Sequence, residues 1–174
     1  MNPPRLPLLT TFGLGHMRIA SGTWGSLPPC VVAGCLWLAN LSPANGTNGS
    51  IVFSAVMGVI LVIFSVACVL QGKQAEERWG KDPGEVVADE TAGQCIPLMF
   101  LPAWCFTDFW RAVATVGAAF LLFRILDIIK PWPAKQIQSR PYGWGILLDD
   151  LFAGAYAAVI MQVGARLMEA QAQA

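Results

Sequence analysis

The chain has 174 residues, of which 55% are hydrophobic and only 13% are charged, and its net charge at pH 7 is zero. Soluble domains carry about 25% charged residues. Here the whole stretch from Ile19 to Gly72 has none. This composition excludes an ordinary soluble protein and predicts an integral membrane protein, and the zero net charge gives no reason to expect nucleic acid as a partner. The length suits one domain covering residues 1–174.

Five apolar segments follow in chain order and predict an all-α, multi-helical integral membrane protein with about four or five apolar helices. Only 51–70 has the twenty residues that usually cross a bilayer. The other segments are shorter, and prolines interrupt two of them, so tilted spans, re-entrant helices and helices lying on the membrane all stay open. The segments are 27–41, 51–70, 92–106, 112–126 and 151–167.

The positions of the charges predict a topology. If the five segments alternate across the membrane, nine of the eleven basic residues lie on one side, which the positive-inside rule makes cytoplasmic. All acidic residues except Asp108 and Glu169 share that side. We therefore expect a polar cytoplasmic face that carries any chemistry. Its basic residues are Arg5, Arg18, Lys73, Arg78, Lys81, Arg124, Lys130, Lys135 and Arg140.

The first polar motif on that face is "FGLGHMRIASGTWGSL", residues 12–27. Its glycines let backbone amides turn toward a bound group, and Thr23 and Ser26 add hydroxyl donors. Both features suit an anion such as phosphate. The same residues would also suit a glycine-rich turn that leads into a helix at Leu27.

The second motif is "KDPGEVVADETAG", residues 81–93, in which Asp89 and Glu90 open the next apolar segment. Acidic residues in the first turn of a helix complement the positive end of its dipole. Adjacent carboxylates also supply the hard oxygen ligands that Mg²⁺ prefers. Both interpretations stay open for this pair taken alone.

The third motif is "FRILDIIKPWP", residues 123–133. Arg124, Asp127 and Lys130 are spaced i, i+3 and i+6, which predicts one charged stripe on a helix that ends before Pro131. The stripe could be a ladder of ion pairs with its lysine extended to the membrane edge. It could equally hold a phosphate together with a metal ion.

The fourth motif is "ILLDDLFAG", residues 146–154, with Asp149 and Asp150 between apolar neighbours. One aspartate at the centre of a membrane helix costs about 2.5–3.5 kcal/mol. A position at the start of a helix would explain two adjacent aspartates poorly, because the apolar residues 146–148 indicate that the helix has already begun. Mg²⁺ and a phosphorylated substrate together would balance all the charges on this face. Its five motif carboxylates are Asp89, Glu90, Asp127, Asp149 and Asp150.

In this order, from about Phe12 to Val163, the four motifs resemble those of the phosphatidylglycerophosphatase A family of bacterial, Mg²⁺-dependent lipid phosphatases. The resemblance implies hydrolysis of phosphatidylglycerophosphate to phosphatidylglycerol and inorganic phosphate, a step of phospholipid biosynthesis. It places the protein in the bacterial cytoplasmic (inner) membrane as a multi-pass protein with a cytoplasmic active face.

The resemblance also implies roles for the motif residues. Asp149 or Asp150 acts as general base or nucleophile, and Asp127, Arg124 and Lys130 assist the reaction. Bound Mg²⁺ polarises the phosphate oxygens and lowers the pKa of a water molecule. The metal ligands are Asp89, Glu90, Asp127, Asp149 and Asp150, and phosphate binds Gly22, Thr23, Gly25, Ser26, Arg124 and Lys130.

Two other classes of function are compatible with some of these features. A cation transporter could use the carboxylates to hold a transported ion, but it predicts acidic residues inside the long segment 51–70, which has none. A non-catalytic helical scaffold that binds anionic lipid needs the basic residues but not the five acids.

Overall fold

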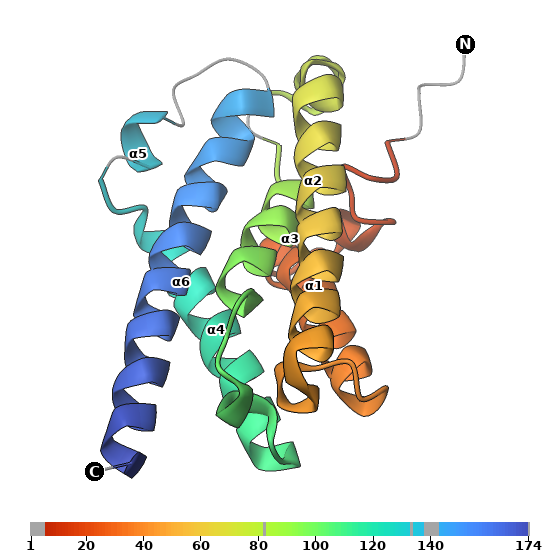
Figure 1. The fold of residues 1–174 in the computed structure, drawn as a ribbon. Coiled ribbons are helices and arrows are strands. Elements are labelled where there is room, and N and C mark those ends of the chain that lie inside the picture. Colours follow the sequence, from red (N-terminus) through yellow and green to blue (C-terminus); the bar gives the residue numbers. More distant parts are fainter. Residues whose placement is uncertain (1–5, 82, 133, 138–142, 174) are drawn as a thin grey trace.

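A computed structural model of the protein describes residues 6–81, 83–132, 134–137 and 143–173 (Figure 1). The described part is mostly helical and contains no β-strand, which confirms the predicted all-α class. Arg5, Arg140 and the side chain of Lys135 lie outside the described residues. The α-helices are α1 (Ser21–Leu38), α2 (Gly46–Trp79), α3 (Ala88–Cys95), α4 (Phe109–Ile129), α5 (Ala134–Ile137) and α6 (Gly143–Gln173). Short 3₁₀ helices are η1 (Leu14–His16), η2 (Pro43–Asn45), η3 (Ile96–Leu98) and η4 (Ala103–Phe106).

The long helices run lengthwise and alternate in direction, so the chain passes back and forth between two ends (Figure 1). Helices α1, α3 and α6 begin at one end, where α2 and α4 finish; we call it the site end. At the opposite, far end, η2 links α1 to α2, and η4 precedes α4. This arrangement matches the alternation expected from the five apolar segments.

Segment 92–106 differs from expectation because it is not one apolar helix. It comprises the end of α3, then η3 and η4. Pro97 and Pro102 explain the break, since proline removes a backbone donor and restrains the residue before it. At 1.5 Å per residue the eight residues of α3 extend about 12 Å, too short to cross a bilayer alone. All the side chains of α3 except Glu90 are buried, so this helix lies in the interior of the bundle.

Helix α2 also differs from expectation, because it continues well past the apolar segment 51–70. The stretch from Gln71 to Trp79 lies between the apolar segments 51–70 and 92–106, where we expect a loop, but it is helical. Lys73 and Glu77 form an exposed i, i+4 ion pair there, with Nζ and Oε1 3.9 Å apart. The 34 residues of α2 extend about 51 Å, so its polar last turns continue beyond a hydrocarbon layer of about 30 Å.

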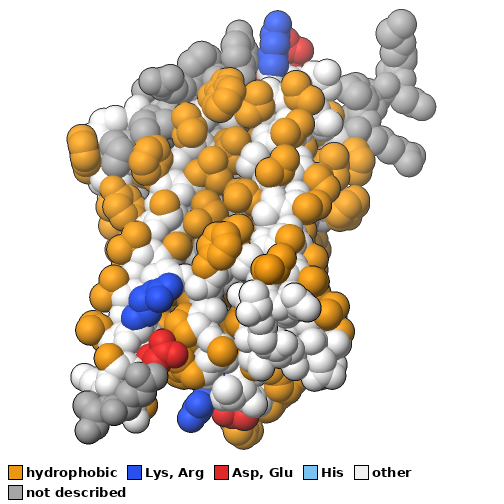
Figure 2. Space-filling view, viewed as in Figure 1, with side chains coloured by type: hydrophobic (Ala, Val, Ile, Leu, Met, Phe, Trp, Pro, Cys, Tyr) orange, Lys and Arg blue, Asp and Glu red, His pale blue; other side chains and the backbone are white. Residues whose placement is uncertain are grey.

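The outer surface is apolar along most of its length. Among the residues that the structure describes, three stretches are long and apolar enough to cross a membrane: Ser21–Trp79, which contains α1 and α2, Phe109–Ile129 and Gly143–Ala172. Only about a third of their residues are buried. Figure 2 shows hydrophobic side chains over the middle of the molecule, with charged side chains toward its two ends. An apolar surface of this extent is typical of contact with lipid.

Candidate metal and phosphate site

Three carboxylates from two helices meet inside the site end. Asp89 and Glu90 lie on α3 and Asp150 lies on α6, and one oxygen from each is within 4.8 Å of the others. Asp89 is 8% exposed and Asp150 is 3% exposed. In the described part of the chain, each of the three has a buried oxygen without a hydrogen-bond partner: Oδ1 of Asp89, Oε2 of Glu90 and Oδ2 of Asp150. Buried like charges with free oxygens are the donor set that a hard divalent cation requires, so these residues fit Mg²⁺.

Two glycines explain why α3 and α6 come close enough to bring these acids together. A Cβ on Gly93 would lie 2.7 Å from the carbonyl oxygen of Asp150. A Cβ on Gly154 would press into the carbonyl oxygen of Gly93. Because neither glycine has a side chain, the two backbones touch and Asp150 reaches Asp89 on the neighbouring helix.

Burial and the repulsion between neighbouring carboxylates change the pKa values of Asp89 and Glu90 on α3. Burial, with the negative charges of Glu90 and Asp150, raises the pKa of the Asp89 carboxyl well above its usual range. Burial also raises the pKa of Glu90; the charge of Asp127 adds to this, while Asp89 and Arg124 oppose it. The folded protein therefore needs either protons or a cation at this site.

Arg124 and Asp127 on α4 extend the site. The Arg124 Nη1 atom lies 2.7 Å from Oδ2 of Asp127 and 3.9 Å from Oε1 of Glu90. All three side chains are at least 84% buried. Asp127 is thus beside the three-carboxylate cluster, with part of its charge balanced by the guanidinium.

The neighbours Asp149 and Asp150 have different partners, which explains why the chain carries both. Lys130 donates a hydrogen bond from Nζ to Oδ2 of Asp149, whereas Asp150 faces the carboxylates of α3. Both lie in the second turn of α6, which begins at Gly143, so the prediction that the helix has already begun is confirmed. Burial lowers the pKa of Lys130, but the hydrogen bond and charge of Asp149 outweigh it and leave this pKa raised.

Helix α4 ends at Ile129, before Pro131, as the sequence predicts. Lys130 then adopts a left-handed conformation, with φ of 48°. This turn takes its side chain out of the predicted stripe and directs it to α6. Only Arg124 and Asp127 of the stripe therefore pair along α4 itself.

Residues 21–27 of the glycine-rich motif lie on a helix, whereas residues 12–20 precede it. Helix α1 begins at Ser21, and the amides of Thr23 and Trp24 already donate to the carbonyl oxygen of Ala20. Ala20 has φ of 53° and provides no side-chain cap. The first turn of α1 therefore points its amides toward the site end, in the manner of a helix terminus that binds anions.

Gly22 is the residue of this motif that reaches the acidic cluster. A Cβ there would lie 2.9 Å from both Nη atoms of Arg124 and still closer to Oε1 of Glu90. Thr23, the next residue, is half-buried. The absence of a side chain at Gly22 thus leaves room for the Arg124–Glu90 contact against α1.

Gly25 and Ser26 serve the packing of α1. A Cβ on Gly25 would lie 2.6 Å from Cβ of Val87, and the carbonyl oxygen of Gly25 accepts a 2.7 Å hydrogen bond from Thr91. Ser26 is fully buried and donates to the carbonyl oxygen of Gly22, 2.8 Å away. These contacts hold α1 against α3 and so fix Gly22 beside Glu90.

Gln94 was not among the site residues predicted from the sequence. This side chain is fully buried and follows Glu90 by four residues, so both lie on the same side of α3. Neither of its polar atoms has a hydrogen-bond partner among the residues that the structure describes. A single amide inside the apolar segment 92–106 was the available signal, because buried polar groups need partners.

Fold and site together define a helical membrane protein with a buried, charge-rich site at one end, fitted to a cation and an anion. The sequence pattern of the family named Phosphatidylglycerophosphatase A matches residues 8–165. The chain belongs to this family, and it is a phosphatase of phospholipid metabolism.

Curated relatives cover nearly the whole chain. Phosphatidylglycerophosphatase A of Escherichia coli is 34% identical over 163 residues, which are 92% of this chain and 83% of that protein. The protein of the same name in Haemophilus influenzae is 32% identical over 168 residues, which are 92% of this chain and 88% of that protein. A protein of Bacteroides thetaiotaomicron, provisionally named as a phosphatidylinositol-3-phosphatase, is 34% identical over 171 residues, with 92% and 94% covered. No solved structure matches the chain.

Proposed function

We propose that this protein hydrolyses phosphatidylglycerophosphate to phosphatidylglycerol and inorganic phosphate, using Mg²⁺, at the cytoplasmic face of the bacterial inner membrane. The observation that carries the proposal is the cluster of Asp89, Glu90 and Asp150, each with a free oxygen. Two basic side chains flank it: Arg124 lies near Glu90, and Lys130 pairs with Asp149, the neighbour of Asp150. The names of the two phosphatidylglycerophosphatase relatives support the substrate. The excess of basic residues that the sequence predicts for this side of the membrane supports the cytoplasmic orientation.

The proposed metal ligands are Asp89, Glu90 and Asp150, with Asp127 and Asp149 flanking them. When bound, Mg²⁺ supplies Lewis acidity toward phosphate oxygens and water. Arg124 and Lys130 are the cations available to offset the negative charge of the phosphoryl group as it is transferred. The start of α1, with Gly22 and the hydroxyl of Thr23, adds donors for the phosphate, while Gly25 and Ser26 hold this turn in place.

The reaction breaks the bond between phosphorus and the glycerol oxygen. In one route, water attacks phosphorus and gives a proton to Asp149 or Asp150, the glycerol oxygen leaves, and that proton passes on to it to form the hydroxyl of phosphatidylglycerol. In the other, one of these aspartates attacks phosphorus, the glycerol oxygen leaves and is protonated, and water then hydrolyses the acyl phosphate to inorganic phosphate and the free aspartate. Lys130 orients Asp149 for either role through its hydrogen bond.

Phosphate release by the purified protein tests the proposal. Release from phosphatidylglycerophosphate should require Mg²⁺ and stop with a chelator. It should fall strongly in Asp149→Asn, with the helical circular dichroism unchanged. Asp108→Asn is the matched control because this far-end residue caps α4, and asparagine caps a helix as well as aspartate does. Absence of release would favour the ion-transport or lipid-scaffold role, and full activity of Asp149→Asn would remove this residue from the mechanism.

A second candidate substrate is a phosphatidylinositol monophosphate, which the name of the Bacteroides relative favours. The acidic cluster and its cations would bind the phosphate of either lipid. Initial rates on the two lipids, presented in the same mixed micelles, decide between them. We expect phosphatidylglycerophosphate to give the higher kcat/KM, and the reverse order would reassign the substrate.

A further inference from the structure

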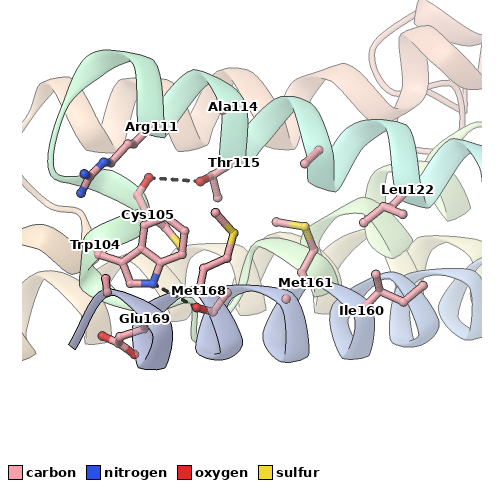
Figure 3. A pocket seen from close by; sticks show the side chains of 14 residues that line it. Trp104, Cys105, Arg111, Ala114, Thr115, Leu122, Ile160, Met161, Met168 and Glu169 are labelled. Atoms are coloured by element: carbon pink, nitrogen blue, oxygen red, sulfur yellow. Dashed lines mark hydrogen bonds between the residues drawn. The ribbon is translucent and has the colours of Figure 1, made fainter. Parts of the chain in front are cut away.

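A long apolar groove lies between α4, α6 and η4, with a volume of about 790 Å³ (Figure 3). The buried hydroxyl of Thr115 and the half-buried indole of Trp104 are already hydrogen-bonded within the protein. The Thr115 hydroxyl donates to the carbonyl oxygen of Cys105 at 3.1 Å, and the Trp104 indole donates to the carbonyl oxygen of Ala165 at 3.2 Å. The groove therefore offers its occupant an almost wholly hydrophobic wall.

The groove runs along the helices and has a charged end and an apolar end. Figure 3 shows Arg111 and Glu169 at one end and Leu122 and Ile160 at the other. The eleven residues from Arg111 to Leu122 correspond to about 16 Å along α4. The apolar end is the one directed to the site, because α4 continues from Leu122 to Lys130.

The contact between α4 and α6 continues from the groove toward the site. Leu126 follows Leu122 by one turn and packs in the same small cluster, and Lys130 follows one turn later. Lys130 then pairs with Asp149 on α6. About 12 Å of helix separates Leu122 from Lys130. From the site toward the far end, the surface is thus first charged and then apolar along the groove, as far as Arg111 and Glu169. A phospholipid has the same order of a charged head group followed by an apolar acyl chain.

We propose that this groove binds one acyl chain of the phospholipid whose phosphate occupies the site, a proposal that rests on the proposed function. Both walls belong to stretches able to cross a membrane, so the groove opens toward hydrocarbon. Helices α4 and α6 pack directly against each other, so the groove follows the line of their contact, as an extended acyl chain would.

Two glycine substitutions provide a matched test. Gly164 lines the groove and Gly117 on α4 does not, and a Cβ at either position meets no atom within 4 Å. Gly164→Leu fills the groove without an internal clash, and Gly117→Leu adds the same side chain outside it. Activity is measured on long-chain phosphatidylglycerophosphate and on a water-soluble analogue with butanoyl chains.

We expect Gly164→Leu to lower kcat/KM about tenfold on the long-chain lipid, which corresponds to losing contact with about two methylene groups. Its kcat/KM on the butanoyl analogue and both values for Gly117→Leu should stay unchanged. An equal loss on both substrates, no loss on the long-chain lipid, or a changed oligomeric state in Gly164→Leu would overturn the proposal.

A binding measurement separates this proposal from the proposed function. Phosphatidylglycerophosphate with a photoreactive acyl chain should label peptides of α4 and α6 that line the groove, and Gly164→Leu should remove this labelling. If the wild type releases no phosphate from either substrate, the proposed function fails. Labelling elsewhere, or labelling that Gly164→Leu does not change, refutes the acyl-chain groove whatever the activity.

Discussion

Gly22→Ala tests whether the first turn of α1 is part of the site. The added Cβ would lie 2.9 Å from the Nη atoms of Arg124 and closer to Oε1 of Glu90, whereas ordinary contacts begin near 3.4 Å. Glu90 must therefore retreat by about 1 Å and Arg124 by about 0.5 Å. Both atoms are at the ends of flexible side chains, so the helix accepts the change while the charged groups move.

The expected loss of activity follows from that displacement. A misplacement of about 1 Å in a catalytic group costs up to about 10²-fold in rate. Alanine is also about 1 kcal/mol better than glycine inside a helix, which offsets the crowding in the folded state. Gly22→Ala should thus lower kcat/KM about 10²-fold on phosphatidylglycerophosphate without lowering the melting temperature.

Gly34→Ala is the control, because this residue lies on the same helix and a Cβ there meets no atom within 4 Å. Phosphate release and thermal unfolding are measured for both variants in one detergent at saturating Mg²⁺. Gly34→Ala should keep the wild-type rate. If Gly22→Ala also keeps that rate, or if both variants lose activity equally, the position of Glu90 and Arg124 against α1 does not matter for turnover.

Three further predictions concern stability. Without divalent cations, Asp150→Asn should raise the melting temperature, because it removes one of three like charges that are buried together. The same variant should abolish the increase in melting temperature that Mg²⁺ causes in the wild type. An unchanged increase with Mg²⁺ would contradict this. The folded-state pKa values of Asp89 and Glu90 are raised, so above about pH 4 the folded protein binds more protons than the unfolded chain. Without metal, the melting temperature should therefore fall as the pH rises from about 4 through the raised pKa values. Saturating Mg²⁺ should flatten that pH profile, and a flat profile without metal would contradict the account. Gly154→Ala meets the backbone of α3 and should cost about 1–3 kcal/mol, whereas Gly164→Ala should cost nothing, as measured by urea unfolding; equal effects would refute the close packing of α3 and α6.

Features set by neighbouring residues in the chain were predictable from the sequence. The end of α4 before Pro131 follows from the restraint that proline places on the preceding residue. The placement of Asp149 and Asp150 inside a helix followed from the apolar residues 146–148. The alternation of the chain between two ends followed from the order of apolar and charged segments.

Features that depend on contacts between distant segments were not predictable. The sequence could not assign Asp149 to Lys130 and Asp150 to α3, because this division depends on the left-handed turn at Lys130 and on how α6 packs. Nor could it show that residues 21–27 of the glycine-rich motif are helical, since glycine favours loops unless packing, here of Gly25 against Val87, selects the helix.

The most direct test of the site is calorimetric titration of Mg²⁺ into the purified wild-type protein and into Asp150→Asn, both in detergent at neutral pH. Saturable binding to the wild type that disappears in the variant is the predicted result, because the acids of α3 need the carboxylate of α6 to complete the ligand set. Equal binding by both proteins, or no saturable binding by either, would contradict the assignment of these carboxylates as a magnesium site.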